Sequence, residues 1–136
     1  MRKHVLSNWG ALRLTVLVVT LGGALVLSAC GRFGTSEPLI EVPGGDVKRG
    51  RQAIVAHGCI SCHTIPGVRR ADAQVGPPLT EWALRRYIAG TLPNEPEHLI
   101  AWIINPQEIE PGTAMPTLGV TPEEARDIAA YLYTLD

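Results

Sequence analysis

The chain has 136 residues, a formal net charge of −1 at pH 7 and a hydrophobic content of 46%. This length suits one small domain with an additional segment and excludes a pair of full-sized domains. The near-zero charge hides an asymmetry: residues 46–86 carry seven basic and three acidic side chains, whereas residues 95–136 carry one and eight. Such a distribution either orients a partner during encounter or solvates exposed faces. Nucleic-acid binding is not indicated, since acids prevail and aromatic residues do not alternate with basic ones.

The N-terminal part of the chain predicts export. Arg2, Lys3 and Arg13 accompany an uncharged run at residues 14–29, which leads into Leu-Ser-Ala-Cys at Cys30. A basic start, an apolar stretch and small residues at a cleavage site are typical of an export signal. The Leu-Ser-Ala-Cys ending resembles a bacterial lipobox. That resemblance implies a lipoprotein in which Cys30 is lipidated and becomes the first residue after cleavage.

Two alternatives remain for this N-terminal segment. An uncleaved helix from near Trp9 could anchor the chain in the membrane, or cleavage elsewhere could release an exported protein. All three interpretations place the rest of the chain outside the cytoplasm, on the outer face of a bacterial cytoplasmic membrane. We therefore expect a signal peptide or anchor at residues 1–29 and a lipidation site with a flexible, Gly- and Pro-rich tether at 30–45. The domain itself is expected at 46–136.

The sequence of the domain predicts helices separated by long loops. Helices are expected, in chain order, over residues 46–58, 81–89, 96–104 and 121–135, with irregular segments at 64–80 and around 111–116. Asp46 and Gly58 are the start and stop signals of the first helix. Thr121, Pro122 and Glu124 form a capping box at the start of the last. Because no run alternates with period two, we expect an all-α domain.

The stretch Cys59-Ile-Ser-Cys62-His63 matches Cys-x-x-Cys-His, the pattern of covalent haem attachment. Two thiols three positions apart can form thioethers to the two vinyl groups on one edge of a porphyrin, and His63 is then held beneath the iron. One alternative is a Cys59–Cys62 disulfide, which would need a βαβ context. Another is a zinc site, for which a second Cys pair is missing. Together with the export signal, the pattern predicts one covalent haem c.

Met115 is the candidate for the second axial ligand, because it is the only methionine besides the initiator. It lies in Pro-Gly-Thr-Ala-Met-Pro, a proline-framed loop that can aim a thioether at iron. His57 is too close to Cys59 to reach the opposite haem face, and His98 falls on the first turn of an expected helix. A core position for Met115 is the alternative. Methionine–histidine ligation raises the reduction potential relative to two histidines, and it closes the iron to small molecules, which favours an electron carrier over an enzyme.

The segment from Asp46 to Asp136 resembles the class I (mitochondrial-type) cytochromes c. Four motifs agree in order and spacing: Cys59-x-x-Cys62-His63, Gly-Pro-Pro-Leu at 76–79, Asn-Pro at 105–106 and Pro-Gly-Thr-Ala-Met-Pro at 111–116. The stretch 87–116 further resembles the cytochrome c domain of bacterial haem-copper oxidase subunit II. The resemblance implies about four short helices around a covalently bound haem. It also implies that the Pro77 carbonyl faces the outer nitrogen of His63 and that Trp102 packs beside the Met115 sulfur.

Further roles follow from the same resemblance. Gly50 would lie where the first and last helices cross, with Tyr131 as its neighbour. Arg85 and Arg86 would approach the haem propionates, or are surface arginines. The implied function is that of a membrane-tethered monohaem cytochrome c passing single electrons in a respiratory chain, with a quinol-oxidising complex or a haem-copper oxidase as partner. The alternative is a haem enzyme, or a gas or redox sensor, with a displaceable sixth ligand.

Overall fold

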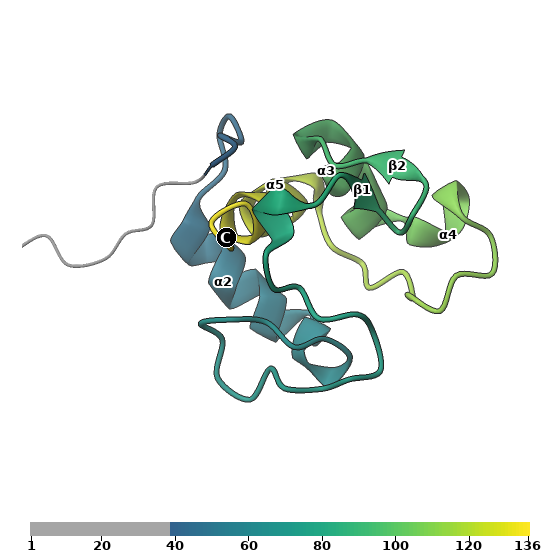
Figure 1. Cartoon of the computed structure of the whole chain (residues 1–136), viewed down its shortest axis with the longest axis horizontal. Coiled ribbons are helices and arrows are strands. Elements are labelled where there is room, and N and C mark those ends of the chain that lie inside the picture. Colours follow the sequence, from purple (N-terminus) through teal and green to yellow (C-terminus); the bar gives the residue numbers. More distant parts are fainter. Residues whose placement is uncertain (1–38) are drawn as a thin grey trace, which may run out of the picture. The chain divides into compact units, whose positions relative to one another are not determined.

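The computed structural model describes residues 39–136, which are mostly helical with long connecting loops (Figure 1). The expected signal or anchor, the lipidation site at Cys30 and most of the expected tether lie outside the described residues. Within 39–136, no helix combines the length and the apolar character that crossing a membrane requires. The fold and the site below therefore concern the C-terminal domain alone.

The described chain contains four α-helices, two short strands and two 3₁₀ turns. In chain order they are α2 (Val47–Ala56), 3₁₀ turns at Cys59–Ser61 and Trp82–Leu84, β1 (Tyr87–Ile88), β2 (Leu92–Pro93), α3 (Pro96–Ile104), α4 (Pro106–Ile109) and α5 (Pro122–Leu132). The expected first, third and last helices are confirmed, although the first and last are shorter than expected. Asp46 caps α2 by accepting a hydrogen bond from Arg49 N, and Thr121 with Glu124 forms the expected capping box of α5.

The helix expected over residues 81–89 is wrong. Only Trp82–Leu84 forms a 3₁₀ turn, after which the chain enters β1, which pairs antiparallel with β2. The reason lies in the buried side chain of Asn94, whose amide donates to the carbonyl oxygens of Trp82 and Arg85 at 2.9 and 3.1 Å. Arg85 O is thus bonded to a side chain, and Trp82 O accepts both from that side chain and from Arg85 N at 3.1 Å, the i→i+3 bond of the 3₁₀ turn. The domain is mostly helical with one two-stranded hairpin, not purely α.

The first and last helices cross in direct backbone contact. A Cβ atom at Gly50 would lie 1.9 Å from the carbonyl oxygen of Asp127, so only glycine allows this approach. Asp46 N donates to Asp127 Oδ1 at 2.7 Å, and Arg49 Nε donates to Asp127 Oδ2 at 2.6 Å. The Arg49 hydrogen bond holds the pKa of the Asp127 carboxyl below its usual range. The expected place of Gly50 at the crossing is confirmed.

Tyr131, the expected neighbour of Gly50, lies on α5 about one turn beyond Asp127. The atoms nearest to a Cβ at Gly50 belong to Asp127 and Ile128. The Tyr131 hydroxyl instead donates to the carbonyl oxygen of Pro66 at 2.6 Å and ties α5 to the loop that follows the Cys-x-x-Cys-His motif. In Figure 1, α2 and α5 lie side by side, and α3, the hairpin and α4 occupy the other half of the domain.

Candidate haem site

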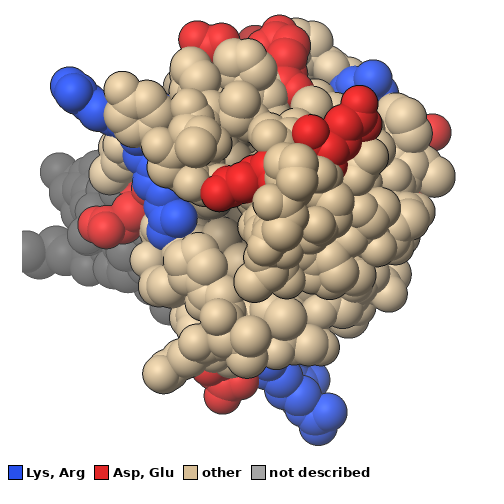
Figure 2. All heavy atoms as spheres, turned by 90° about the vertical axis from the view of Figure 1, so that its right-hand side faces the viewer, with Lys and Arg blue, Asp and Glu red and all other residues tan. Residues whose placement is uncertain are grey.

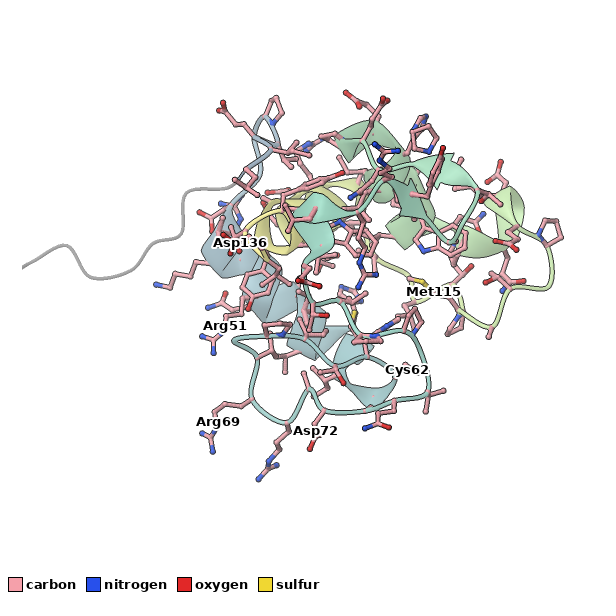
Figure 3. All side chains as sticks on the ribbon, in the orientation of Figure 1. Arg51, Cys62, Arg69, Asp72, Met115 and Asp136 are labelled. Atoms are coloured by element: carbon pink, nitrogen blue, oxygen red, sulfur yellow. The ribbon has the colours of Figure 1, made fainter. Side chains whose placement is uncertain are left out.

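A cavity of about 420 Å³ lies inside this domain. Its lining brings together residues from α2, α3, α5 and the two long loops. Of the residues singled out from the sequence it includes Cys59, Cys62, His63, Pro77, Arg85, Trp102 and Met115. Figure 3 shows Cys62 and Met115 on two separate segments that border this space. The fold thus gathers at one cavity residues that span more than 50 positions of sequence.

The two cysteines and the histidine lie on one compact turn at the end of α2. Gly58 has φ +73°, in the left-handed region, and lets the chain leave the helix and enter the 3₁₀ turn that begins at Cys59. The backbone N–H groups of Cys62 and His63 both donate to Cys59 O, at 3.2 and 3.1 Å. Both cysteines are free thiols, and burial raises the pKa of the Cys59 thiol. Within residues 39–136 no group of three or more His, Cys, Asp or Glu could hold a metal ion.

The imidazole of His63 is held by the loop that carries Gly-Pro-Pro-Leu. Its Nδ1 lies 2.7 Å from the carbonyl oxygen of Pro77, the contact that the resemblance implies. With Nδ1–H donating to that carbonyl, Nε2 is the nitrogen left to bind a metal. Gly76 lies so close that a Cβ there would be 2.5 Å from His63 Cε1, and its N–H donates to Cys62 O at 2.7 Å. The sequence motif Gly-Pro-Pro-Leu indicated this loop, but it did not predict that Gly76 itself packs against the His63 ring.

In another part of the lining, Met115 is half-buried and packs against the hydrophobic core. Its loop is held by Gln107, whose Nε2 donates to the carbonyl oxygens of Thr113 and Met115 at 2.7 and 2.9 Å. Gly112 N donates back to Gln107 Oε1 at 3.3 Å. Trp102, on α3, is buried and lines the same cavity. Gln107 escaped notice in the sequence, and its place just after Asn-Pro is the only signal that could have drawn attention to it.

One wall of the cavity carries hydrogen-bond donors. Trp82 is 6% exposed, and its indole Nε1 is buried without an acceptor among the described residues. The Arg85 guanidinium lies 5.0 Å from the Trp82 ring centroid and also lines the cavity; desolvation lowers the pKa of Arg85. Arg85 donates to the carbonyl oxygens of Pro78 and Thr80. Arg86 is exposed and does not line the cavity, so only one of the two arginines reaches the site.

These features fit a haem. The lining is predominantly apolar, as a porphyrin requires, and includes two thiols, an imidazole and a thioether from separate segments of the chain. A buried donor left unpaired costs about 1–3 kcal/mol, so the indole of Trp82 requires an acceptor from outside the described residues. A haem propionate is such an acceptor.

Comparison with known proteins agrees with a haem site. The chain is similar to cytochrome c oxidase subunit 2 of Alkalihalophilus pseudofirmus (38% identity over 88 residues) and of Bacillus sp. strain PS3 (32% over 103 residues). These matches cover 64% and 73% of this chain but only 25% and 28% of the oxidase subunits. The chain is also similar to cytochrome c of Tetrahymena pyriformis, with 33% identity over 108 residues, which cover 73% of this chain and 97% of that protein. Residues 47–136, which contain the whole cavity, match the family model for cytochrome c, so this chain belongs to the cytochrome c family.

Proposed function

We propose that the protein is a membrane-tethered monohaem cytochrome c that transfers single electrons in a respiratory chain. One observation carries this proposal: a single cavity is bordered by the Cys59–Cys62–His63 turn and by Met115. When bound there, haem supplies an iron that alternates between Fe(II) and Fe(III). The protein is then an electron carrier and not an enzyme in its own right, although it could be a subunit of a respiratory oxidoreductase complex.

The chain's own residues define how the haem is held. Cys59 and Cys62 would form thioethers with the porphyrin, which would keep it in the domain even if an iron ligand were lost. His63 Nε2 and the Met115 sulfur would be the iron ligands, with the His63 ring in the orientation that the Pro77 carbonyl imposes. This pair raises the reduction potential relative to two histidines and leaves no open coordination position for a substrate.

The rim of the cavity is suited to a redox partner. The lining residues that are exposed are all uncharged, namely Val75, Pro77, Tyr87, Ala89, Ala114, Pro116 and Leu118. Figure 2 shows a broad area without charged side chains on the face that carries α4. A partner can approach these uncharged residues closely without desolvating ions, and the two charged lining residues, Arg85 and Glu110, are half-buried. The likeness to oxidase subunit 2 supports a haem-copper oxidase as acceptor, and a quinol-oxidising complex would be a suitable donor.

The proposed place of action is the outer face of the bacterial cytoplasmic membrane. Cleavage before Cys30 and its lipidation would anchor the domain at 46–136 through the tether at 30–45. Mass spectrometry of the protein extracted from membranes tests this step. A diacylated Cys30 at the N-terminus is expected, and an intact segment 1–29 would instead support the uncleaved anchor. A Cys30→Ser variant that remains in the membrane fraction after processing would contradict lipid anchoring.

The second candidate function is a haem enzyme or sensor with a displaceable sixth ligand. The observation in its favour is that the loop carbonyls of Thr113 and Met115 are both bonded by one side chain, Gln107. A loop held in this way can open more easily than one held by backbone hydrogen bonds. In that case Met115 would leave the iron when a gas or peroxide binds.

Substitution of Met115 distinguishes the two functions. For an electron carrier, Met115→Ala abolishes the thioether–iron absorption band at the red edge of the visible spectrum and lowers the potential. Leu118→Ala is the matched control, because Leu118 also lines the cavity but has no thioether. A haem stain on a denaturing gel checks covalent attachment in each variant. If the wild-type protein lacks the band, or binds small ligands as fast as Met115→Ala does, the electron-carrier assignment fails.

A further inference from the structure

The donors on one wall of the cavity are held by a buried hydrogen-bond network. Asn94 is 8% exposed, and its Nδ2 donates to the carbonyl oxygens of Trp82 and Arg85 at 2.9 and 3.1 Å. Tyr133 is fully buried, and its hydroxyl donates to Asn94 Oδ1 at 3.0 Å. Asn94 therefore bonds the two ends of the turn that carries the Trp82 and Arg85 side chains. Tyr133 in turn fixes which way the Asn94 amide faces.

We call Trp82 and Arg85 the carboxylate corner. Its two side chains stack at 5.0 Å and both line the cavity. One offers a buried neutral N–H without an acceptor within the described residues, and the other a partly desolvated guanidinium. A neutral donor beside a guanidinium is the pairing that binds a carboxylate, because the guanidinium offsets its charge and the indole completes its hydrogen bonds. A haem bears two such carboxylates.

None of the acidic groups around this corner serves as the acceptor for the Trp82 indole N–H. Glu81 is the acid whose charge acts on Arg85, and it is exposed. Glu95 and Glu97 act on Tyr133, and both are also exposed. Burial raises the pKa of Tyr133, so its hydroxyl stays protonated and keeps donating to Asn94. None of these acids accepts a hydrogen bond from the Trp82 indole.

We propose that Asn94 and Tyr133 are positioning residues for haem: they hold the carboxylate corner in the orientation in which Trp82 Nε1 and Arg85 bind one propionate. This inference rests on the proposed function. The corner offsets part of the negative charge of that propionate. When the corner is weakened, the less neutralised carboxylate stabilises Fe(III) more, so the reduction potential at neutral pH falls. The residues that set the potential thus include two that lie behind the cavity wall and touch no haem atom.

The test compares two tyrosines at the end of the same helix in haem-loaded protein. Tyr133→Phe removes the hydroxyl that donates to Asn94, whereas Tyr131→Phe removes one that donates to Pro66 O, away from the corner. The readouts are the reduction potential and the hydrogen exchange of the Trp82 indole N–H, followed by NMR in the diamagnetic Fe(II) state. We expect Tyr133→Phe to lower the potential and to speed this exchange. Tyr131→Phe lowers stability and leaves both readouts at the wild-type values.

A second variant distinguishes loss of the hydrogen-bond donor from a general structural effect of the Tyr133 substitution. Trp82→Phe removes the N–H donor together with one ring of the indole, so it lowers the potential by itself, and Tyr133→Phe added to it produces little further shift. Fully additive shifts, or equal readouts for the two tyrosine variants, overturn the inference. So does a Trp82 indole that exchanges as fast in wild-type protein as an exposed indole. Failure of the proposed function looks different, because the chain would then lack covalent haem or the thioether–iron band altogether.

Discussion

The histidine side and the methionine side of the cavity are held by different kinds of contact. On the histidine side, backbone hydrogen bonds join Gly76 N to Cys62 O and Leu79 N to Thr64 O, at 2.7 and 2.8 Å. On the methionine side, side chains make the corresponding bonds: Gln107 binds two carbonyls of the Met115 loop, and Asn105 Oδ1 accepts from Thr117 Oγ1. The histidine side thus has backbone bonds that no side-chain substitution removes, in addition to side-chain bonds such as that of Tyr131 to Pro66 O, whereas the bonds to the carbonyls of Thr113 and Met115 depend on one replaceable side chain. The iron should therefore keep its histidine and lose its methionine first.

The largest effect is expected from Gly76→Ala. A Cβ at this position would lie 2.5 Å from His63 Cε1, so the ring or the loop has to move and the bond to Pro77 is lost. We expect the haem-loaded protein to lose about 3 kcal/mol of stability, as for overpacking in a rigid site. Denaturant unfolding followed by haem absorbance measures this loss.

Gly112→Ala on the methionine side is the control. A Cβ there meets nothing within 4 Å, but φ is +88°, so the cost is that of backbone strain alone, about 1–2 kcal/mol. If Gly112→Ala destabilises as much as Gly76→Ala does, the close contact with the imidazole is not what holds the histidine side.

A smaller effect is expected from Gln107→Ala. The carbonyls of Thr113 and Met115 lose their donor, but both lie near the surface and can bind water, so stability falls by roughly 1 kcal/mol. The sharper consequence is kinetic: imidazole added to the Fe(III) protein should replace Met115 about tenfold faster in this variant. Gln52→Ala, at an exposed position of α2, serves as the matched control. Unchanged exchange in Gln107→Ala would mean that the loop is rigid without its clamp.

The smallest effect concerns an acidic residue that connects α5 to the histidine side. Glu124 Oε1 at the start of α5 lies 3.1 Å from Nε2 of His57, which precedes the Cys-x-x-Cys-His turn. Hydrogen bonds from Thr121, and then the contact with His57, lower the pKa of Glu124 from 4.5 to about 2. Because the folded-state pKa is the lower one, Glu124 contributes stability above pH about 4.5, and the contribution is lost as the pH falls towards about 2.

Urea midpoints measured between these pH values check this expectation. The wild-type midpoint should fall more steeply with decreasing pH than that of Glu124→Gln, and the two curves should approach each other at the acid end. Parallel curves would show that Glu124 is not perturbed by the fold. Glu123→Gln, one position earlier in the same helix, controls for the loss of a negative charge near the helix start.

Local signals in the sequence were sufficient for much of the fold. Thr121 and Glu124 lie within one turn of each other, so their capping box depends on nothing far away, and it is present. Pro96 and the Asn-Pro at 105–106 bound α3 for the same reason. Pro106 also opens α4, which was not expected. Proline has no backbone N–H and therefore ends one helix. It can begin the next, because the N–H groups of a first turn have no partner within the helix.

Contacts between distant positions account for what was missed. In place of the helix expected at 81–89 there is a 3₁₀ turn whose Trp82 and Arg85 carbonyls accept hydrogen bonds from Asn94, and Asn94 is itself oriented by Tyr133, 39 residues further on. The role of Gly76 shows only when the His63 ring packs on it. Arg85 and Arg86 are indistinguishable as sequence neighbours, but the extended backbone of Arg85 directs only one of them to the cavity. Such choices depend on which surface a side chain meets after folding.

The contact between Gly50 and Asp127 has a consequence for how the domain unfolds. The two residues are 77 positions apart, from 127 − 50, and they meet backbone to backbone. Closing a chain loop of that length costs on the order of 4 kcal/mol of entropy, which neither helix can offset alone. The segments of the cavity before α5 all lie inside this loop, and the lining residues of α5, Ile128 and Leu132, follow directly after it. Loss of the crossing therefore releases all of them together, and unfolding should be a single cooperative transition without a surviving half-domain.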